Sequence, residues 1–268
     1  ASNASDIYEI HTPRQNLRMD LRHGVIVRNW LIDHQPMVFD ESAGGMMSQI
    51  RFYFPIGYVG VDQMPMAYRF VSQGFDEADS AVHVAFESTI EHGELLGAKV
   101  TKTFVIPVED VGYQLKIRID APEDRDLTLG LWIKDVPRFL AGIDDARPRI
   151  ESGGQWKEDW FGRPALFLAK DNDEYNVYID IIRNMVQPQK IDNVSEGRLC
   201  LEGKPLSLSI ESNQAIAFYL WSSMRSSLVT FETLFEPVAI NKGESHTFKI
   251  QYGISDVRKA SSTLPARQ

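Results

Sequence analysis

The stretch YQLKIRI at residues 113–119 decides the fold class. Its apolar residues, from Tyr113 to Ile119, stand at every second position, and polar residues stand between them. Because side chains alternate between the two faces of a β-strand, this pattern predicts a strand with one face in a core and the other toward water. The pattern recurs in LTLGLWI at 127–133, YNVYIDI at 175–181, LSLSIES at 206–212 and HTFKIQY at 246–252.

The rest of the chain has further strand-like runs, but it has no convincing amphipathic helix of more than about three turns. Turn-forming sequences such as VEDVG at 108–112 and APEDRD at 121–126 separate neighbouring runs, as they do between antiparallel strands. We therefore predict an all-β fold, an antiparallel sandwich or barrel. Further strands are expected at 16–21, 24–28, 48–54, 66–72, 81–89, 99–106, 164–170, 198–202, 214–221 and 228–234.

The 268 residues contain 43% hydrophobic side chains, enough for a sizeable core. No internal repeat or low-complexity linker divides the chain, so one domain is the simplest organisation. We expect this domain to span residues 16–256, with residues 1–15 as an N-terminal extension and residues 257–268 as a tail. The first residues, ASNASDIYEI, are typical of a processed or tag-like terminus, which fits either a cytoplasmic protein or one whose export signal has been removed.

The net charge of −9 disfavours nucleic acid and anionic membrane surfaces as partners, because both are bound mainly through Lys and Arg. No run of roughly 18 apolar residues is present to span a bilayer. The single cysteine, Cys200, excludes an intramolecular disulfide and a clustered thiolate site. A neutral or weakly charged ligand fits this composition better, and the oligomeric state stays open.

The sequence lacks the common cofactor and nucleophile motifs. It has no G-x-S-x-G elbow and no glycine-rich phosphate loop between a strand and a helix. No two of its six histidines have the three- or four-residue helical spacing of zinc sites. We therefore predict neither a cofactor nor a metal. His92, in EHGELLG, is a loop candidate for acid–base chemistry, although exposure in a turn is its plainer explanation.

A dense polar group follows the strand at 127–133. Lys134, Asp135 and Arg138 stand where the strand ends, and Trp132 has the opposite parity to the core leucines. The segment 134–163 lacks a clean strand period and adds further aromatic and basic residues. Aromatic rings that stack on C–H surfaces, together with charged groups that bind hydroxyls, are typical of sugar sites. The predicted substrate-binding residues are Trp132, Arg138, Trp156, Trp160 and Arg163, although packing against a sheet would also explain the tryptophans.

The late stretch FETLFEPVAIN at 231–241 resembles the C-terminal signature of the aldose 1-epimerases, the galactose mutarotases. In that family a Glu-Thr pair precedes a Pro, an Asn and a Gly-Glu turn into the final strand. Here these residues match Glu232-Thr233, Pro237, Asn241 and Gly243-Glu244. Residues 98–135 also look like successive strands of the family. The resemblance implies a large antiparallel β-supersandwich that binds a sugar on a concave sheet face.

The resemblance further implies that Glu232 is the general base on the anomeric hydroxyl. In the family a histidine protonates the ring oxygen, but the matching strand end of this chain offers Lys134, Asp135 and Arg138 instead. The chain is thus similar to a divergent member that lacks the catalytic histidines. We expect Asp135, Lys134 or His92 to be the partner of Glu232.

Three other functions fit the same residues. A non-catalytic carbohydrate-binding or structural sandwich would need no acid–base pair, and the missing histidine favours it. A glycosidase would need a second carboxyl group at a suitable separation from Glu232, for which Asp135, Glu158 and Asp159 are candidates. A polysaccharide lyase would need an arginine beside the base. In each case the predicted ligand is a mono- or oligosaccharide.

Overall fold

The computed structural model describes residues 6–38, 45–53, 61–62, 66–136, 147–152, 155–157, 165–169, 188–190, 198–202, 206–212, 214–222 and 229–256. These residues form three β-sheets and one short 3-10 helix, η2 (Gly93–Leu95). All paired strands are antiparallel except β14 and β15. The all-β supersandwich predicted above is confirmed. No helix within these ranges has the length and apolarity needed to cross a membrane.

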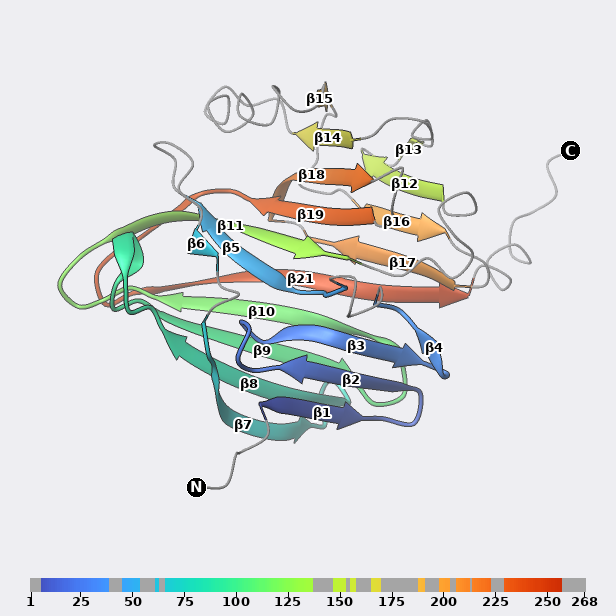
Figure 1. Cartoon of the computed structure of the whole chain (residues 1–268), viewed down its shortest axis with the longest axis horizontal. Coiled ribbons are helices and arrows are strands. Elements are labelled where there is room, and N and C mark those ends of the chain that lie inside the picture. The colour runs from blue at the N-terminus through green and yellow to red at the C-terminus, as the bar shows by residue number, and fades with distance from the viewer. Residues whose placement is uncertain are drawn as a thin grey trace, which may run out of the picture.

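The largest sheet has nine strands, and the other two sheets lie against one of its faces (Figure 1). Its order is β13 (Gln155–Lys157), β12 (Arg147–Ser152), β16 (Arg198–Glu202), β17 (Leu206–Glu211), β21 (Ser245–Asp256), β10 (Gly112–Asp120), β9 (Lys99–Pro107), β8 (Ala81–Thr89) and β7 (Arg69–Asp76).

The eight-stranded sheet covers the β21 side of the nine-stranded sheet. Its order is β15 (Pro188–Lys190), β14 (Ala165–Ala169), β18 (Ala215–Ser222), β19 (Val229–Phe235), β11 (Leu127–Asp135), β5 (Gln49–Tyr53) and β6 (Val61–Asp62), with β20 (Val238–Ile240) paired to β11. The four-stranded sheet covers the β7–β10 side and consists of β1 (Ile7–His11), β2 (Gln15–Asp20), β3 (Ile26–Ile32) and β4 (Gln35–Pro36).

The predicted alternation of β10 is borne out by burial. Tyr113, Leu115, Ile117 and Ile119 all have no exposed surface, whereas Lys116 and Arg118 on the other face are intermediate and exposed. Tyr113 stacks on Tyr252 of β21 with ring centroids 4.4 Å apart. These side chains form the core between the nine-stranded sheet and the two sheets that cover it.

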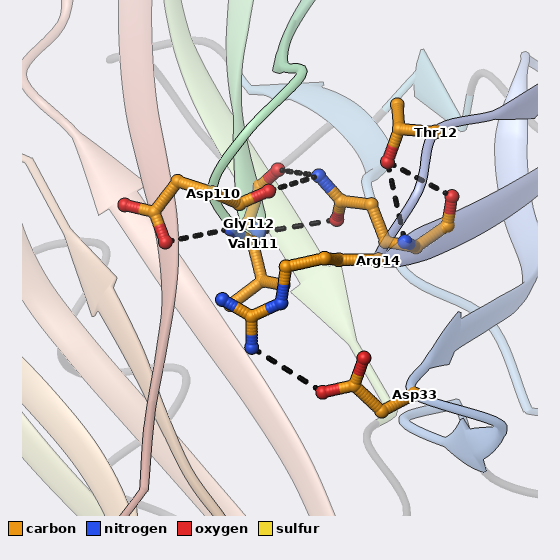
Figure 2. A network of polar contacts seen from close by, with 7 residues as sticks. Thr12, Arg14, Asp33, Asp110, Val111 and Gly112 are labelled. Carbon is orange, nitrogen blue, oxygen red and sulfur yellow. Dashed lines mark hydrogen bonds and ion pairs between the residues drawn. The ribbon is translucent and has the colours of Figure 1, made fainter.

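Gln15 joins the four-stranded sheet to the sandwich. Its side chain is 2% exposed, and its Nε2 donates to the carbonyl of Gly112 at 2.9 Å. Its Oε1 accepts from Gly112 N at 3.1 Å and from Trp30 Nε1 at 2.9 Å, so both ends of the amide are satisfied inside the protein. Figure 2 shows this junction, flanked by the ion pair between Arg14 and Asp33.

Two segments differ from their predicted structure. Residues 7–11 are predicted to belong to an N-terminal extension, but they form β1, which pairs along its length with β2. The segment 134–163 shows no clean strand period, but β12 and β13 lie within it. A short strand at a sheet edge is held by backbone hydrogen bonds and needs no apolar period, so alternation does not reveal it. The outer limits of the domain stay a prediction.

Candidate functional site

The candidate site lies on the face of β19, β11 and β5 that points away from the sandwich interior. Opposite residues in paired antiparallel strands share a face. Glu232 of β19 lies opposite Lys134 of β11, and Lys134 lies opposite Gln49 of β5. We call this set the Glu232 row. Leu131 and Ile133, which alternate with Lys134, have no exposed surface and belong to the core.

A second row runs beside the first. Trp132 lies between Leu234 of β19 and Arg51 of β5. The guanidinium carbon of Arg51 is 6.0 Å from the centroid of the Trp132 ring, at the outer limit of a cation–π contact. The predicted parity of Trp132 is therefore correct. Its side chain is only 9% exposed, so most of the ring is packed rather than offered to solvent.

Tyr53 lies on the same face, further along β5 from Gln49 and Arg51. The position of Tyr53 on β5 is opposite Gly130 of β11, and a methyl group on Gly130 would lie 2.1 Å from the Tyr53 ring. The ring thus lies directly over the glycine backbone. Its hydroxyl donates to the carbonyl of Phe235 on β19, so one side chain spans all three strands. Gly130 is needed here because any side chain would displace the ring.

Glu232 and Lys134 are the two predicted catalytic residues that the structure brings together. Glu232 is 7% exposed, whereas Glu236, after the strand end, is exposed. Lys134 is intermediate in burial. A carboxylate and an ammonium on adjacent strands can remove a proton from one substrate oxygen and stabilise negative charge on another.

Asp135 does not join them, because it lies on the opposite face of β11. It has no exposed surface and accepts hydrogen bonds from Ser48 N at 2.7 Å and Tyr252 Oη at 3.1 Å. Burial raises the pKa of Asp135 to about 7, a shift that the charge of Glu232 reinforces and that the two hydrogen bonds and the charge of Lys102 oppose. A direct role as partner of Glu232 at the sugar is thus excluded by its orientation.

His92 is also separated from the Glu232 row. It precedes η2 in the link between β8 and β9 of the nine-stranded sheet. Lys99 after this link pairs with Asp120, just before the chain turns into the start of β11. Lys134 lies seven residues further along β11, roughly 23 Å away at 3.3 Å per residue. His92 is therefore at the wrong end of the strand to act with Glu232.

The side chains of the remaining predicted binding residues lie outside the described part of the chain. Arg138, Trp160 and Arg163 are outside the described residues. The backbone of Trp156 belongs to β13, at the edge of the nine-stranded sheet, but its side chain is outside the description. Sequence reasoning missed Arg51 and Tyr53, for which the only available signal was the period of a short strand with no motif.

The C-terminal motif residues after β19 have a structural role. Asn241 Nδ2 donates to Glu244 Oε2 at 2.8 Å, and Glu244 N donates to the carbonyl of Asn241 at 2.9 Å. Gly243 has a φ of 72°, a left-handed conformation that favours glycine. These residues build the turn from β20 into β21. In the motif, Glu232 belongs to the candidate site, and the Asn-Gly-Glu part shapes the fold.

One group among the described residues has the composition of a metal site. Asp76, Asp79 and His83, at the turn between β7 and β8, have potential ligand atoms within 4.8 Å of one another. Both aspartates are exposed, and His83 already pairs with Asp79 at 2.9 Å. The group lies at the edge of the nine-stranded sheet and is not part of the Glu232 row.

Comparison with known proteins supports the fold and leaves the activity open. No family model matches the sequence, and no curated protein matches it. Among solved structures, a protein from Synechocystis sp. PCC 6803 has a TM-score of 0.65 at 10% identity, with 93% of this chain and 96% of that chain covered.

Two further solved structures are similar over nearly their whole length. A galactose mutarotase-like protein from Clostridium acetobutylicum has a TM-score of 0.62 at 8% identity, covering 93% of this chain and 95% of that chain. A candidate aldose 1-epimerase from Escherichia coli K12 has a TM-score of 0.60 at 11% identity, covering 94% and 99%. This chain therefore has the galactose mutarotase-like fold.

Proposed function

We propose that this chain is a carbohydrate-active protein that binds a sugar against the outer face of β19, β11 and β5, with Glu232 as general base. The observation that carries the proposal is the position of Glu232. It is nearly buried, faces away from the core and has Lys134 as its cross-strand neighbour. A nearly buried carboxylate with a cationic side chain on the neighbouring strand can exchange a proton with a bound sugar hydroxyl while the cation stabilises the charge that forms.

The reaction that fits these groups is interconversion of the two anomers of an aldose. Glu232 takes the proton of the anomeric hydroxyl while the Lys134 ammonium gives a proton to the ring oxygen, and the bond between the anomeric carbon and the ring oxygen breaks. The open-chain aldehyde recloses on its other face by the reverse steps. Lys134 replaces the family histidine as the cation next to the base. Trp132 and Arg51 supply apolar and hydrogen-bonding surface beside the reacting end.

The test is polarimetry on freshly dissolved α-D-galactose and α-D-glucose. The protein should accelerate the approach to the anomeric equilibrium, and Glu232→Gln should abolish the acceleration with the fold intact. Glu236→Gln is the matched control, because that glutamate is exposed just after the same strand. Equal acceleration by the Glu232→Gln variant would refute the role of Glu232 as base.

A non-catalytic sugar-binding module is the second candidate. The strand end that resembles the family site offers Lys134 and no histidine, which favours it because sugar binding needs no acid–base pair. Calorimetry on the same two sugars separates the two functions. Binding that is lost in a Trp132→Ala variant, without conversion of either sugar by the wild-type protein, would establish the module.

A glycosidase is less well supported. Asp135 points to the opposite face, and Glu158 and Asp159 lie outside the described residues. For a polysaccharide lyase, Arg51 on β5 is the candidate for the charge-neutralising group near the base. Product analysis on polymeric substrates would detect either activity.

A further inference from the structure

Ser48, directly before β5, is held by all three of its polar groups. Its backbone N–H donates to Asp135 Oδ1 at 2.7 Å, and its carbonyl accepts from Lys102 Nζ at 2.9 Å. Its hydroxyl shares a hydrogen bond of 2.9 Å with the hydroxyl of Tyr113. Ser48 has a φ of 63°, a left-handed conformation that is uncommon for a residue with a side chain. Such a backbone persists only where its surroundings fix it.

This junction lies directly beneath the Glu232 row. Ser48 precedes Gln49, and Asp135 follows Lys134, which is the cross-strand partner of Gln49. The bond from Ser48 N to Asp135 therefore ties β5 to β11 on the interior side, at the place where Gln49 and Lys134 lie side by side on the outer face. It adds a side-chain tie to the backbone pairing of these two strands at the candidate site.

The junction also contains two buried ionisable groups of opposite sign. Lys102 and Asp135 both have no exposed surface. Lys102 Nζ also donates to the carbonyl of Gly24 at 2.6 Å and lies 5.7 Å from the Tyr68 ring centroid. Isolated charges are rarely buried, so a polar network of this kind is usually retained for specificity or function.

The titratable groups that face Asp135 come from every strand packed around it. Lys102 comes from β9, Tyr113 from β10 and Tyr252 from β21, and Glu232 acts from the neighbouring strand β19. Asp135 pairs with Phe231, next to Glu232, so the Cα atoms of the two acids are about 6 Å apart on opposite faces. The two carboxylates are near enough for each to affect the ionisation of the other.

We propose that Asp135 is a positioning residue for Glu232, which ties β5 to β11 through Ser48 and raises the basicity of Glu232 when it ionises. The expected effect of Asp135 on catalysis rests on the proposed function. Its physical basis does not, because a nearby negative charge increases the proton affinity of a carboxylate in any protein. With an effective dielectric constant of about 20 and a separation of roughly 8 Å across the strands, Coulomb's law sets an upper limit on the order of thirtyfold for this increase.

The test follows the Glu232 carboxyl group by NMR on protein with isotope-labelled glutamate, titrated from about pH 4 to about pH 9. The resonance is assigned as the one missing in Glu232→Gln. In the wild-type protein it should move in two steps, one from its own ionisation and a smaller one at higher pH from Asp135. The second step should be absent in Asp135→Asn.

Two variants make the result specific to the carboxylate of Asp135. Tyr252→Phe removes a donor that favours ionised Asp135, so the second step should shift to higher pH. Thr233→Val is the matched control. Its buried hydroxyl is on the interior face of β19, next to Glu232, and has no hydrogen-bond partner in the described structure, so both steps should remain. A single wild-type step, a second step that persists in Asp135→Asn, or an unmoved step in Tyr252→Phe would overturn the inference.

Polarimetry on α-D-galactose completes the experiment. With a wild-type protein that converts the sugar, Asp135→Asn should lower kcat about tenfold and change KM by less than about twofold, because the base is weakened and the sugar contacts are kept. An unchanged kcat would overturn the catalytic part of the inference. Absence of wild-type conversion would refute the proposed epimerase activity alone, since the NMR titration needs no sugar.

Discussion

Gly130→Ala should be among the most damaging small substitutions in this protein. The added methyl would lie 2.1 to 2.6 Å from three atoms of the Tyr53 ring, closer than any real contact. The ring cannot retreat without breaking the hydrogen bond from its hydroxyl to the carbonyl of Phe235. Overpacking costs about 1–3 kcal/mol, and a buried carbonyl left unsatisfied costs about 1–3 kcal/mol more. We expect a loss of about 2–6 kcal/mol in the free energy of unfolding.

The measurement is urea denaturation followed by circular dichroism, with Gly74→Ala as the control. Gly74 is also a strand glycine with ordinary backbone φ, but a methyl there would have no atom within 4 Å. Its effect should stay within about 0.5 kcal/mol. In a double-mutant cycle, Tyr53→Ala should remove most of the cost of Gly130→Ala, leaving a coupling energy of about 1–3 kcal/mol. Wild-type stability in Gly130→Ala, or strictly additive effects in the cycle, would refute the reasoning.

The remaining predictions concern the buried charges and the two faces of the molecule. Burial raises the pKa of Asp135 from 3.8 to about 7, so the contribution of this group to stability is full below about pH 3.8 and is lost as the pH rises through about 7. In urea titrations, the free energy of unfolding of wild type minus that of Asp135→Asn should decrease over this window. Burial lowers the pKa of Lys102 from 10.5 to about 7. Lys102→Met should therefore gain stability relative to wild type as the pH falls from about 10.5 to about 7, with a constant difference below that, and a flat difference over the whole range would contradict this. Trp132→Phe should weaken sugar binding in calorimetry and leave unfolding cooperative, whereas a weakened fold with unchanged binding would show that the indole only packs the sheet. Phe75, 59% exposed on the edge strand β7, should be replaceable by Ser within about 0.5 kcal/mol and with less self-association in light scattering.

The strand pattern and one half of the candidate site could be predicted from local sequence. Alternation in residues 113–119 correctly identified the buried face of β10, and the parity of Trp132 correctly placed it away from the core leucines. The same period, continued from Ile133 by one more step, places Asp135 inside. That signal is present in the sequence, but the polar residues after Ile133 also fit the end of a strand. Lys102 likewise shares the parity of buried Val100 and Phe104.

What the sequence determined by itself is the fold class and the face on which each strand residue lies, because both follow from a period of two within one short segment. Only the tertiary structure decided which strands are neighbours. Glu232 meets Lys134 and Gln49 through pairings between segments far apart in the chain, and such pairings leave no local pattern. The tertiary structure also separated His92 from Glu232. The physical reason is that the chemistry available to a charged side chain depends on the side chains opposite it on neighbouring strands, and strand pairing determines which side chains those are.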